Sequence, residues 1–337
     1  MEHNLKFLVI GLGSMGKRRI RNLKALGFND IAGFDIRKDR RDEVVEKYSI
    51  PVFDSIGSAT DEFKPQVFVI STSPKYHMEY AYLGLEKEIP CFIEASVVEA
   101  DKIKKLYDIS LDKNVIFAPS CTMRYFPGPK KVKELLKQNL IGKVLNINYH
   151  TGQYLPDWHP WESIKDFYVS DKETGGCREI VPFELTWLND IFGDPRVIYC
   201  HRNKLTDMPI DIDDIYHFIL EYPDNTIANI TIDVVSRPKA VRELRILGSK
   251  GEMIFSADEN CVKYSNIDNP NEWIQYKLDS GTLEKGYINP EEPYISEMQD
   301  FVESVVSKDQ NKFPNTLLDD WKVLNTLCML EKISDGV

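Results

Sequence analysis

The stretch Lys6-Phe-Leu-Val-Ile10, followed at once by Gly11-Leu-Gly13-Ser-Met-Gly16, decides the fold of this chain. A short apolar run bounded by glycines indicates a buried strand, and the helical pattern that follows begins within the glycines. A strand, a glycine-rich turn and a helix in this order form the phosphate-binding corner of a doubly wound α/β domain. The next apolar run, Ile31-Ala-Gly-Phe34, ends in Asp35, about 20 residues further on, where that corner carries an acid.

Each part of this corner has a physical role in binding a dinucleotide. Gly11 permits the tight turn, Gly13 lets the backbone approach a pyrophosphate, and Gly16 lets the helix pack closely on the strand. The backbone N–H groups at the start of the helix, at Ser14 and Met15, favour the phosphates.

The acid indicates which nucleotide is bound. The Asp35 carboxylate can accept hydrogen bonds from ribose hydroxyls and repels a 2′-phosphate, which favours NAD over NADP. Arg37 and Lys38 follow directly and partly offset that repulsion, so NADP stays open as an alternative.

Composition restricts the class of protein. The chain has 337 residues, 42% of them hydrophobic and 28% charged, which is ordinary for a globular protein with two domains. The net charge of −11 argues against a nucleic-acid partner, because phosphate binding requires a basic surface. The six cysteines lack metal-like spacing and indicate reduced thiols, and no metal is expected. We expect a cytoplasmic protein without a membrane span or signal peptide.

Hydrophobic periodicity predicts two domains. In the first, residues 1–122, near-continuous apolar strands alternate with helices, which predicts a Rossmann-type parallel sheet covered on both faces: strands at 6–10, 31–35, 66–72, 90–94 and 115–118, helices at 14–26, 40–48, 76–87 and 101–112. In the second, residues 123–337, alternating strands predict a large open, mostly antiparallel sheet in an α+β domain: strands at 144–149, 216–222, 226–232 and 243–247, helices at 127–138, 178–191, 295–306 and 317–333. The terminal helices are candidates to pack back on the first domain.

Five further short motifs follow one another along the chain, and their order helps to identify a family: Ser71-Thr-Ser-Pro74 with His77, Glu94-Ala-Ser96, Arg124-Tyr-Phe-Pro127, Ile141-Gly142 and Gly175-Gly176. Together with the first domain they resemble the Gfo/Idh/MocA oxidoreductases over nearly the whole chain. The resemblance implies NAD(P)-dependent oxidation or reduction of CH–OH groups in sugars, inositols or nucleotide-linked sugars. It also implies that Ser71, Thr72, Ser73, Pro74 and Glu94 line the nicotinamide end of the cofactor, with His77 and Ala95 beside them.

The chain departs from the family where the proton is handled. Hydride transfer from a carbinol carbon needs a base for the hydroxyl proton, and the family uses the lysine of Glu-Lys-Pro, whose place Ala95 takes here. The family's Gly-Gly-Gly-x-Leu-x-Asp-x-Gly-x-His stretch is also altered. Its Asp falls on Ile180 and its His on Glu184, or on Leu185 if the alignment shifts by one.

Other side chains are therefore candidates for the proton transfer and for the substrate. His159, Glu184 and Glu179 are the candidate catalytic groups, because histidine titrates near neutrality and burial raises the pKa of a carboxyl. Segment 150–168 is rich in aromatic and polar groups suited to a sugar, and the candidate substrate-binding residues are Arg124, Tyr154, Trp161, Tyr168 and Arg178. Each has a purely structural alternative, as a turn, packing or ion-pair residue.

Two other functions stay open for the whole chain. It could bind a nucleotide as a sensor or partner subunit without turnover, or use tightly bound NAD for transient redox in an epimerase or lyase. We expect a homodimer or homotetramer formed through the second-domain sheet, whose broad face suits a partner subunit.

Overall fold

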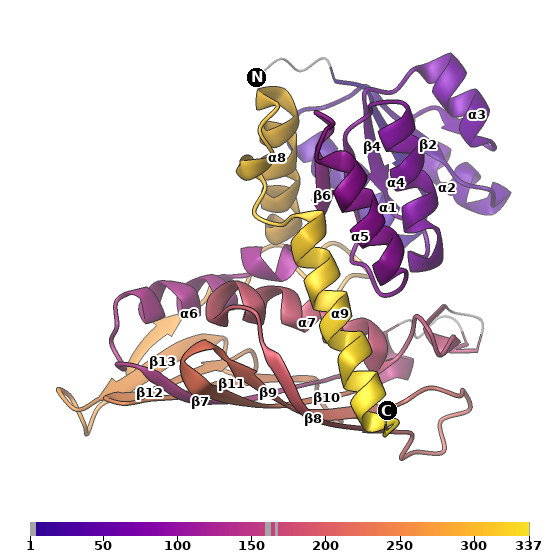
Figure 1. Cartoon of the computed structure of the whole chain (residues 1–337). Helices are drawn as coiled ribbons and strands as arrows, with labels where there is room; N and C mark the ends of the chain where they lie inside the picture. The colour runs from indigo at the N-terminus through magenta and orange to yellow at the C-terminus, as the bar shows by residue number, and fades with distance from the viewer. Residues whose placement is uncertain (1–4, 159–162, 166–167, 337) are drawn as a thin grey trace. The chain divides into compact units, whose positions relative to one another are not determined.

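The computed structural model of the chain describes residues 5–158, 163–165 and 168–336, which fold into two compact units (Figure 1). The first unit runs to Thr122 and adds Gly281–Trp321 from the C-terminal part of the chain. The second comprises Met123–Ser280 and resumes at Lys322, so the border falls within the last helix. No described helix is long and apolar enough to span a membrane.

The first unit is built on a parallel sheet. Its described strands pair in the order β3-β2-β1-β4-β5-β6 and are β1 (Phe7–Ile10), β2 (Ile31–Phe34), β3 (Val52–Phe53), β4 (Val67–Ile70), β5 (Cys91–Ile93) and β6 (Phe117–Pro119). All residues of β1, β2 and β4 are buried, which explains their uninterrupted apolar sequences. The order of strands reverses between β1 and β4, and doubly wound sheets bind ligands at the carboxyl ends of strands at such a point. Gly11 follows β1 there.

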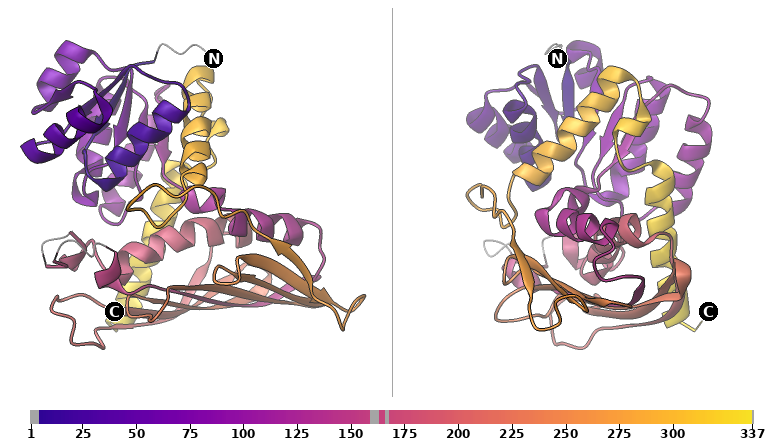
Figure 2. Two further views of the ribbon diagram at one scale, coloured as in Figure 1. Left: turned by 180° about the vertical axis from the view of Figure 1, so that it is seen from behind. Right: turned by 90° about the vertical axis from the view of Figure 1, so that its left-hand side faces the viewer.

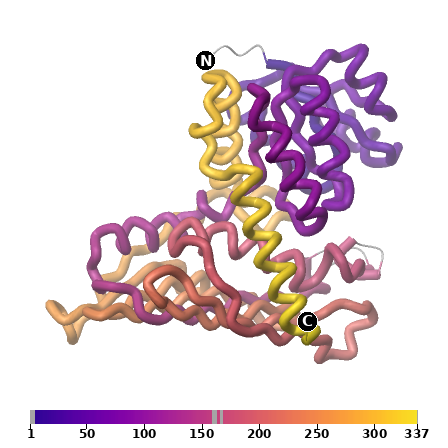
Figure 3. The backbone as a smooth tube through the Cα atoms, in the orientation of Figure 1, coloured from indigo at the N-terminus to yellow at the C-terminus, as the bar shows by residue number. Residues whose placement is uncertain are grey.

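Helices cover this sheet: α1 (Ser14–Ala25), α2 (Lys38–Tyr48), the short α3 (Ile56–Ser58), α4 (His77–Glu86) and α5 (Ala100–Ser110). A helix from far along the chain, α8 (Glu292–Ser307), packs against α1 (Figures 2 and 3). The ring of Phe92 on β5 lies 5.6 Å from that of Phe301 and 6.2 Å from that of Phe313, measured between ring centroids. The segment 281–321 therefore completes the core of the first unit.

The second unit is a large sheet with helices on one face. Its described strands pair in the order β14-β13-β12-β11-β7-β10-β9-β8 and are β7 (Val144–Gly152), β8 (Arg196–Asn203), β9 (Ile215–Tyr222), β10 (Thr226–Asp233), β11 (Val241–Gly248), β12 (Gly251–Ser256), β13 (Cys261–Asn266) and β14 (Ile274–Lys277). Among these described strands, only β7 and β10 pair in parallel. Helices α6 (Pro127–Lys137) and α7 (Cys177–Phe192) belong to this unit, and the last helix, α9 (Leu317–Ser334), reaches it with its C-terminal part.

Alternation along β7 explains which face is covered. Ile147 and Tyr149 are buried, and the Tyr149 ring meets that of Trp187 on α7 edge-on at 5.5 Å. Their neighbour Asn148 points to the opposite face and is exposed. The predicted fold class, a Rossmann sheet followed by a mostly antiparallel sheet, is confirmed.

Candidate functional site

The turn after β1 has the shape that a pyrophosphate requires. A Cβ on Gly11 would lie 2.6 Å from the Ser71 carbonyl oxygen, and one on Gly16 would lie 1.9 Å from that of Gly11, so both positions exclude a side chain. A Cβ on Gly13 would instead make an ordinary van der Waals contact with the guanidinium of Arg40, 3.6 Å from Nη1, and would not collide with the backbone. The N-cap residue of α1 is Gly13, which has no side chain to cap the helix, so in the described part of the chain the first-turn N–H groups at Ser14 and Met15 can bind an anion.

Asp35 is held beside this turn by the backbone. The Leu12 N–H donates to its Oδ2 over 2.8 Å, and the Arg37 N–H donates to its Oδ1 over 2.9 Å. The guanidinium of Arg37 itself pairs with Asp39 at 2.5 Å. The Asp35 carboxylate is thus fixed in orientation at the tip of β2, where it can accept ribose hydroxyls.

The loop after β4 contains an unpaired buried hydroxyl. Thr72 Oγ1 is buried and has no hydrogen-bond partner among the described residues, an arrangement that a bound ligand would satisfy. Ser73 precedes the short 3₁₀ turn Pro74–Tyr76. His77 Nε2 lies 3.0 Å from the Thr72 carbonyl oxygen, and burial lowers the pKa of His77. His77 is therefore a neutral ring that supports this loop from below.

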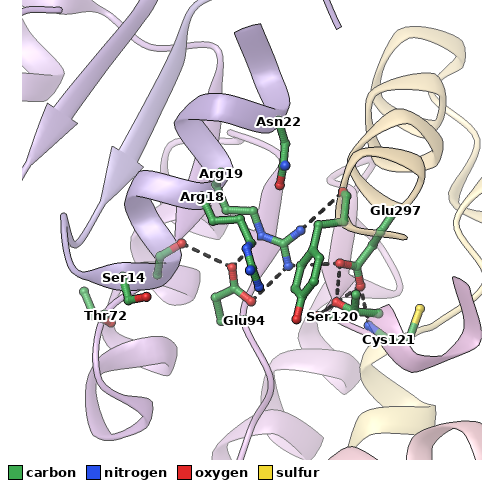
Figure 4. A network of polar contacts seen from close by, with 12 residues as sticks. Ser14, Arg18, Arg19, Asn22, Thr72, Glu94, Ser120, Cys121 and Glu297 are labelled. Carbon is green, nitrogen blue, oxygen red and sulfur yellow. Dashed lines mark hydrogen bonds and ion pairs between the residues drawn. The ribbon is translucent and has the colours of Figure 1, made fainter. Parts of the chain in front are cut away.

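Glu94 follows β5 and takes part in a buried network with Arg19 of α1 and Glu297 of α8 (Figure 4). Arg19 Nε donates to Glu94 Oε1 over 2.6 Å and Nη2 to Oε2 over 3.0 Å, while Nη2 lies 2.9 Å from Glu297 Oε2. Ser71 Oγ donates to Glu94 Oε1 over 3.4 Å. Ala95, the next residue, has no titratable group.

Glu297 has hydrogen-bond donors on both carboxylate oxygens. Its Oε1 accepts from Ser120 Oγ at 3.0 Å and from the Cys121 N–H at 2.6 Å, and its Oε2 accepts from Thr122 Oγ1 at 2.6 Å. Burial raises the pKa of Glu297, and Arg19 and these donors act against that rise. The network therefore fixes the end of β6 as well as the guanidinium that holds Glu94.

A second set of ion pairs lies next to the first on α1. Arg18 Nε and Arg21 Nη2 each lie 3.0 Å from Glu291 Oε1, and the guanidinium of Arg18 stacks on the ring of Tyr294, 4.0 Å from its centroid. Three arginines of α1 thus meet three glutamates, which leaves this buried region without excess charge.

In the second unit, Glu184 is enclosed by donors. It is fully buried on α7 and accepts from Tyr149 Oη at 2.6 Å, from Trp187 Nε1 at 2.7 Å and from Arg242 Nη2 at 2.6 Å. This arrangement gives Glu184 a structural task, which is to join α7 to β7 and β11.

The two arginines expected to bind substrate have internal partners. Arg124 Nε donates to the Thr186 carbonyl oxygen over 3.1 Å, and Arg178 Nε donates to Glu331 Oε1 on α9 over 2.6 Å. Both hold helices of the second unit together. Each also forms an ion pair within the unit, because Arg124 Nη1 lies 3.6 Å from Asp190 Oδ1 and Arg178 Nε lies 2.6 Å from Glu331 Oε1.

Glu179 is different from Glu184 in its surroundings. It lies in the first turn of α7, and its Oε1 accepts from the Tyr168 hydroxyl at 2.5 Å. Its Oε2 is covered and has no hydrogen-bond partner among the described residues. Burial raises the pKa of Glu179 to about 7.

The aromatic segment is described in part. Tyr154 lies beneath the exposed guanidinium of Arg237, whose Cζ is 3.6 Å from the ring centroid, a contact between distant residues that the sequence did not indicate. His159 and Trp161 lie outside the described residues. No group of three or more His, Cys, Asp or Glu side chains that could hold a metal occurs in the described part of the chain.

Solved structures with this fold include nucleotide-bound oxidoreductases. An oxidoreductase from Agrobacterium radiobacter in complex with NAD+, L-tartaric acid and magnesium is 13% identical, with a TM-score of 0.85 over 98% of this chain and 96% of that one. Levoglucosan dehydrogenase in complex with NADH is 15% identical, with a TM-score of 0.83 over 98% and 97%. An inositol dehydrogenase homolog from Azotobacter vinelandii with NAD+ is 13% identical, with a TM-score of 0.81 over 98% and 95%.

Family models match the sequence of both units. Residues 5–120 match the oxidoreductase family with an NAD-binding Rossmann fold, and residues 130–254 match the GFO/IDH/MocA C-terminal domain. No curated protein sequence matches the chain. On the two family models, the chain belongs to the Gfo/Idh/MocA family of oxidoreductases, and its first unit is an NAD-binding domain.

Proposed function

We propose that this chain transfers a hydride between NAD and a hydroxyl-bearing carbon of a small sugar-type molecule, with Glu179 as the group that moves the proton. Family membership supports the oxidoreductase part. Two proteins of the same fold, named as a levoglucosan dehydrogenase and an inositol dehydrogenase homolog, support the substrate class.

The observation that carries the proposal is the state of the Glu179 carboxyl. An effective acid or base at neutral pH has a pKa near 7, and burial brings the pKa of Glu179 to about 7. Its Oε1 is held by the Tyr168 hydroxyl, and its covered Oε2 has no partner among the described residues. Glu184, by contrast, has donors on both oxygens and would have to break a buried cluster to accept a proton.

In this proposal, residues of the first unit bind the cofactor and Glu179 transfers the proton. When bound, NAD supplies the carbon that accepts the hydride. The first-turn N–H groups of α1 would bind its pyrophosphate, and the Asp35 carboxylate would accept hydrogen bonds from its ribose hydroxyls. Arg19 holds Glu94 in a fixed orientation at the end of β5, next to Ala95. Glu179 Oε2 takes the proton of the substrate hydroxyl during oxidation and returns it during reduction.

The test is the pH dependence of kcat/KM for oxidation in a screen of sugars and inositols. We expect the rate to rise with pH around an apparent pKa near 7 and to fall by about 100-fold or more in Glu179→Gln. Glu272→Gln, which neutralises an exposed carboxylate of the same unit, is the control and should keep the activity.

Other outcomes separate the alternatives. Binding of NADH without turnover of any substrate would favour a sensor or partner subunit. Protein purified with NAD that needs no added cofactor would favour transient redox. Activity that survives Glu179→Gln would remove Glu179 from the proton transfer and leave the oxidoreductase assignment intact.

We further propose that the chain forms a homo-oligomer through the outer face of the large sheet. Apolar side chains are exposed on two of its strands: Ile198 and Tyr199 on β8, and Leu247 on β11. The molar mass in light scattering tests this proposal, which fails if the chain is a monomer at micromolar concentration.

A further inference from the structure

Four basic side chains lie at the start of α2, and three of them are occupied away from the glycine turn. Arg37 pairs with Asp39 at 2.5 Å and Lys38 pairs with Asp42 at 2.6 Å. Arg41 Nη1 donates to the carbonyl oxygens of Asp35 and Ile36 over 2.7 and 3.0 Å. These three do not present their charge to a nucleotide above Gly13.

The fourth, Arg40, lies over the turn. Its Nη1 is 3.5 Å from Asp35 Oδ2 and 3.6 Å from the position that a Cβ on Gly13 would take. The guanidinium thus occupies the space between the acid that would accept the ribose hydroxyls and the glycine over which the pyrophosphate would pass. Its side chain is 40% exposed, whereas that of Asp35 is 5% exposed.

We propose that Arg40 is the residue that lets this NAD site also accept NADP, by binding the 2′-phosphate of the adenosine ribose. The proposal rests on the nucleotide-binding part of the proposed function. It also assigns the role to Arg40 and not to Arg37, which directly follows Asp35 and Ile36 and is the arginine that the sequence indicates.

The charges of Asp35 and Arg40 explain how one site could bind both NAD and NADP. Asp35 alone would repel a 2′-phosphate, because two negative groups would meet at one ribose edge. Arg40 offsets the Asp35 charge and offers a planar fork of N–H donors that matches a phosphate in two-point contact. Its ion pair with Asp35 is long and half-exposed, so breaking it costs little.

With NAD the same residues act differently. The ribose hydroxyls are neutral and hydrogen-bond to the Asp35 carboxylate, so NAD brings no further anion to the 2′ position for the guanidinium to bind. Arg40 therefore contributes to the binding of NADPH far more than to that of NADH.

The test compares Arg40→Gln with Arg37→Gln, which removes the same charge from a residue of the same helix start. Dissociation constants for NADH and NADPH are measured by fluorescence titration of the full chain, with thermal unfolding as a check that each variant folds. In Arg40→Gln we expect the NADPH constant to rise by about 10-fold or more and the NADH constant to change by less than about 3-fold. In Arg37→Gln the ratio of the two constants should stay within about 3-fold of the wild-type ratio.

Salt gives a second readout that does not depend on the variants. In the wild type, NADPH affinity should fall more steeply with ionic strength than NADH affinity, and Arg40→Gln should remove most of that difference. A ratio unchanged in Arg40→Gln, an equal shift in Arg37→Gln, or no NADPH binding by the wild type would each overturn the inference. Failure of the wild type to bind NADH would instead overturn the proposed function, and with it the inference.

Discussion

The hydroxyl of Tyr168 controls the proton affinity of Glu179, to which it donates a hydrogen bond. A hydrogen bond to the charged form of a carboxyl lowers its pKa, and the Tyr168 hydroxyl lowers that of Glu179 against the effect of burial. In Tyr168→Phe we therefore expect the midpoint of the oxidation profile to move above its wild-type value near 7. Steady-state kcat/KM measured from pH 5 to 9 checks this shift, and a midpoint that stays in place or moves down would contradict it.

The position of a single residue was predictable from the sequence where one short local motif determines its backbone geometry. The three glycines and Asp35 lie in one turn whose backbone fixes their geometry, so their spacing was enough to predict that turn. Arg19, Arg40 and Glu297 were not found, because each acquires its role from a partner that is distant in sequence or fixed only by rotamer. A pattern of charges on a helix does not indicate which charge faces a turn.

The packing of helix α7 on the sheet depends on one buried carboxylate, that of Glu184. In Glu184→Ala, Tyr149, Trp187 and Arg242 lose their acceptor, and Arg242 is left as a buried charge without its partner. We expect the free energy of unfolding to fall by about 3–5 kcal/mol. Urea unfolding followed by tryptophan fluorescence measures it.

The unfolding of Glu184→Ala is compared with that of a surface variant, and the activity of Glu184→Ala is measured as well. Glu272→Ala, at an exposed position of the same unit, should change the free energy of unfolding by less than about 0.5 kcal/mol. A stable Glu184→Ala variant without activity would return Glu184 to the list of catalytic candidates and contradict the structural role given to it here.

The first turn of α9 contains a buried acid that makes stability depend on pH. Burial raises the pKa of Asp320 from 3.8 to about 7. Between these values the folded state holds a proton that the unfolded state has lost, so stability falls as pH rises through this window, by at most about 4 kcal/mol. In Asp320→Asn this part of the loss should disappear: the variant should match the wild type near pH 4 and exceed it at pH 8.

Denaturant unfolding at several pH values checks the sign. Glu179, whose pKa is also raised to about 7, acts in the same direction, so the wild-type slope contains both contributions and only the difference between the two proteins reports on Asp320. A variant that is less stable than the wild type at pH 8 would mean that Asp320 is ionised and well paired there.

Elements with a strong hydrophobic period were predicted well, and those without one were not. The strands at 6–10 and 226–232 and the helix at 178–191 correspond closely to β1, β10 and α7. Strand β3 has only two residues, too few to show a period. In β8 a register shift between Val197 and Tyr199 breaks the alternation, so that Ile198 and Tyr199 are both exposed.

In the whole molecule, the two structural units are not two consecutive stretches of sequence. A border near residue 122 ends the first Rossmann segment, but the first unit also includes 281–321. That part of the assignment could be suspected only in general terms, because helices at the end of a chain show an apolar face without showing what covers it. The contacts of Phe301 with Phe92 and of Glu297 with Arg19 decide it.

This division predicts which pieces of the chain fold alone. Residues 1–122 by themselves would expose Phe92 and leave Arg18 and Arg21 without Glu291, and they would leave buried Arg19 with one of its two carboxylates. We expect this piece to lack a cooperative thermal transition. Residues 1–122 joined through a flexible Gly/Ser linker to 281–321 should unfold cooperatively and bind NADH, since the linked segment restores the aromatic core together with Glu291 and Glu297.

Circular dichroism during heating and NADH fluorescence titration test the two pieces side by side. The linked piece with Glu297→Ala is a sharper control than the shorter piece, because it keeps the aromatic core and removes only the acceptor of Arg19, Ser120, Cys121 and Thr122. It should unfold at a lower temperature and bind NADH more weakly, because Arg19, which holds Glu94, would lose its ion pair with α8. If residues 1–122 alone unfold as cooperatively as the linked piece, α8 is an accessory to the nucleotide-binding unit and not a part of it.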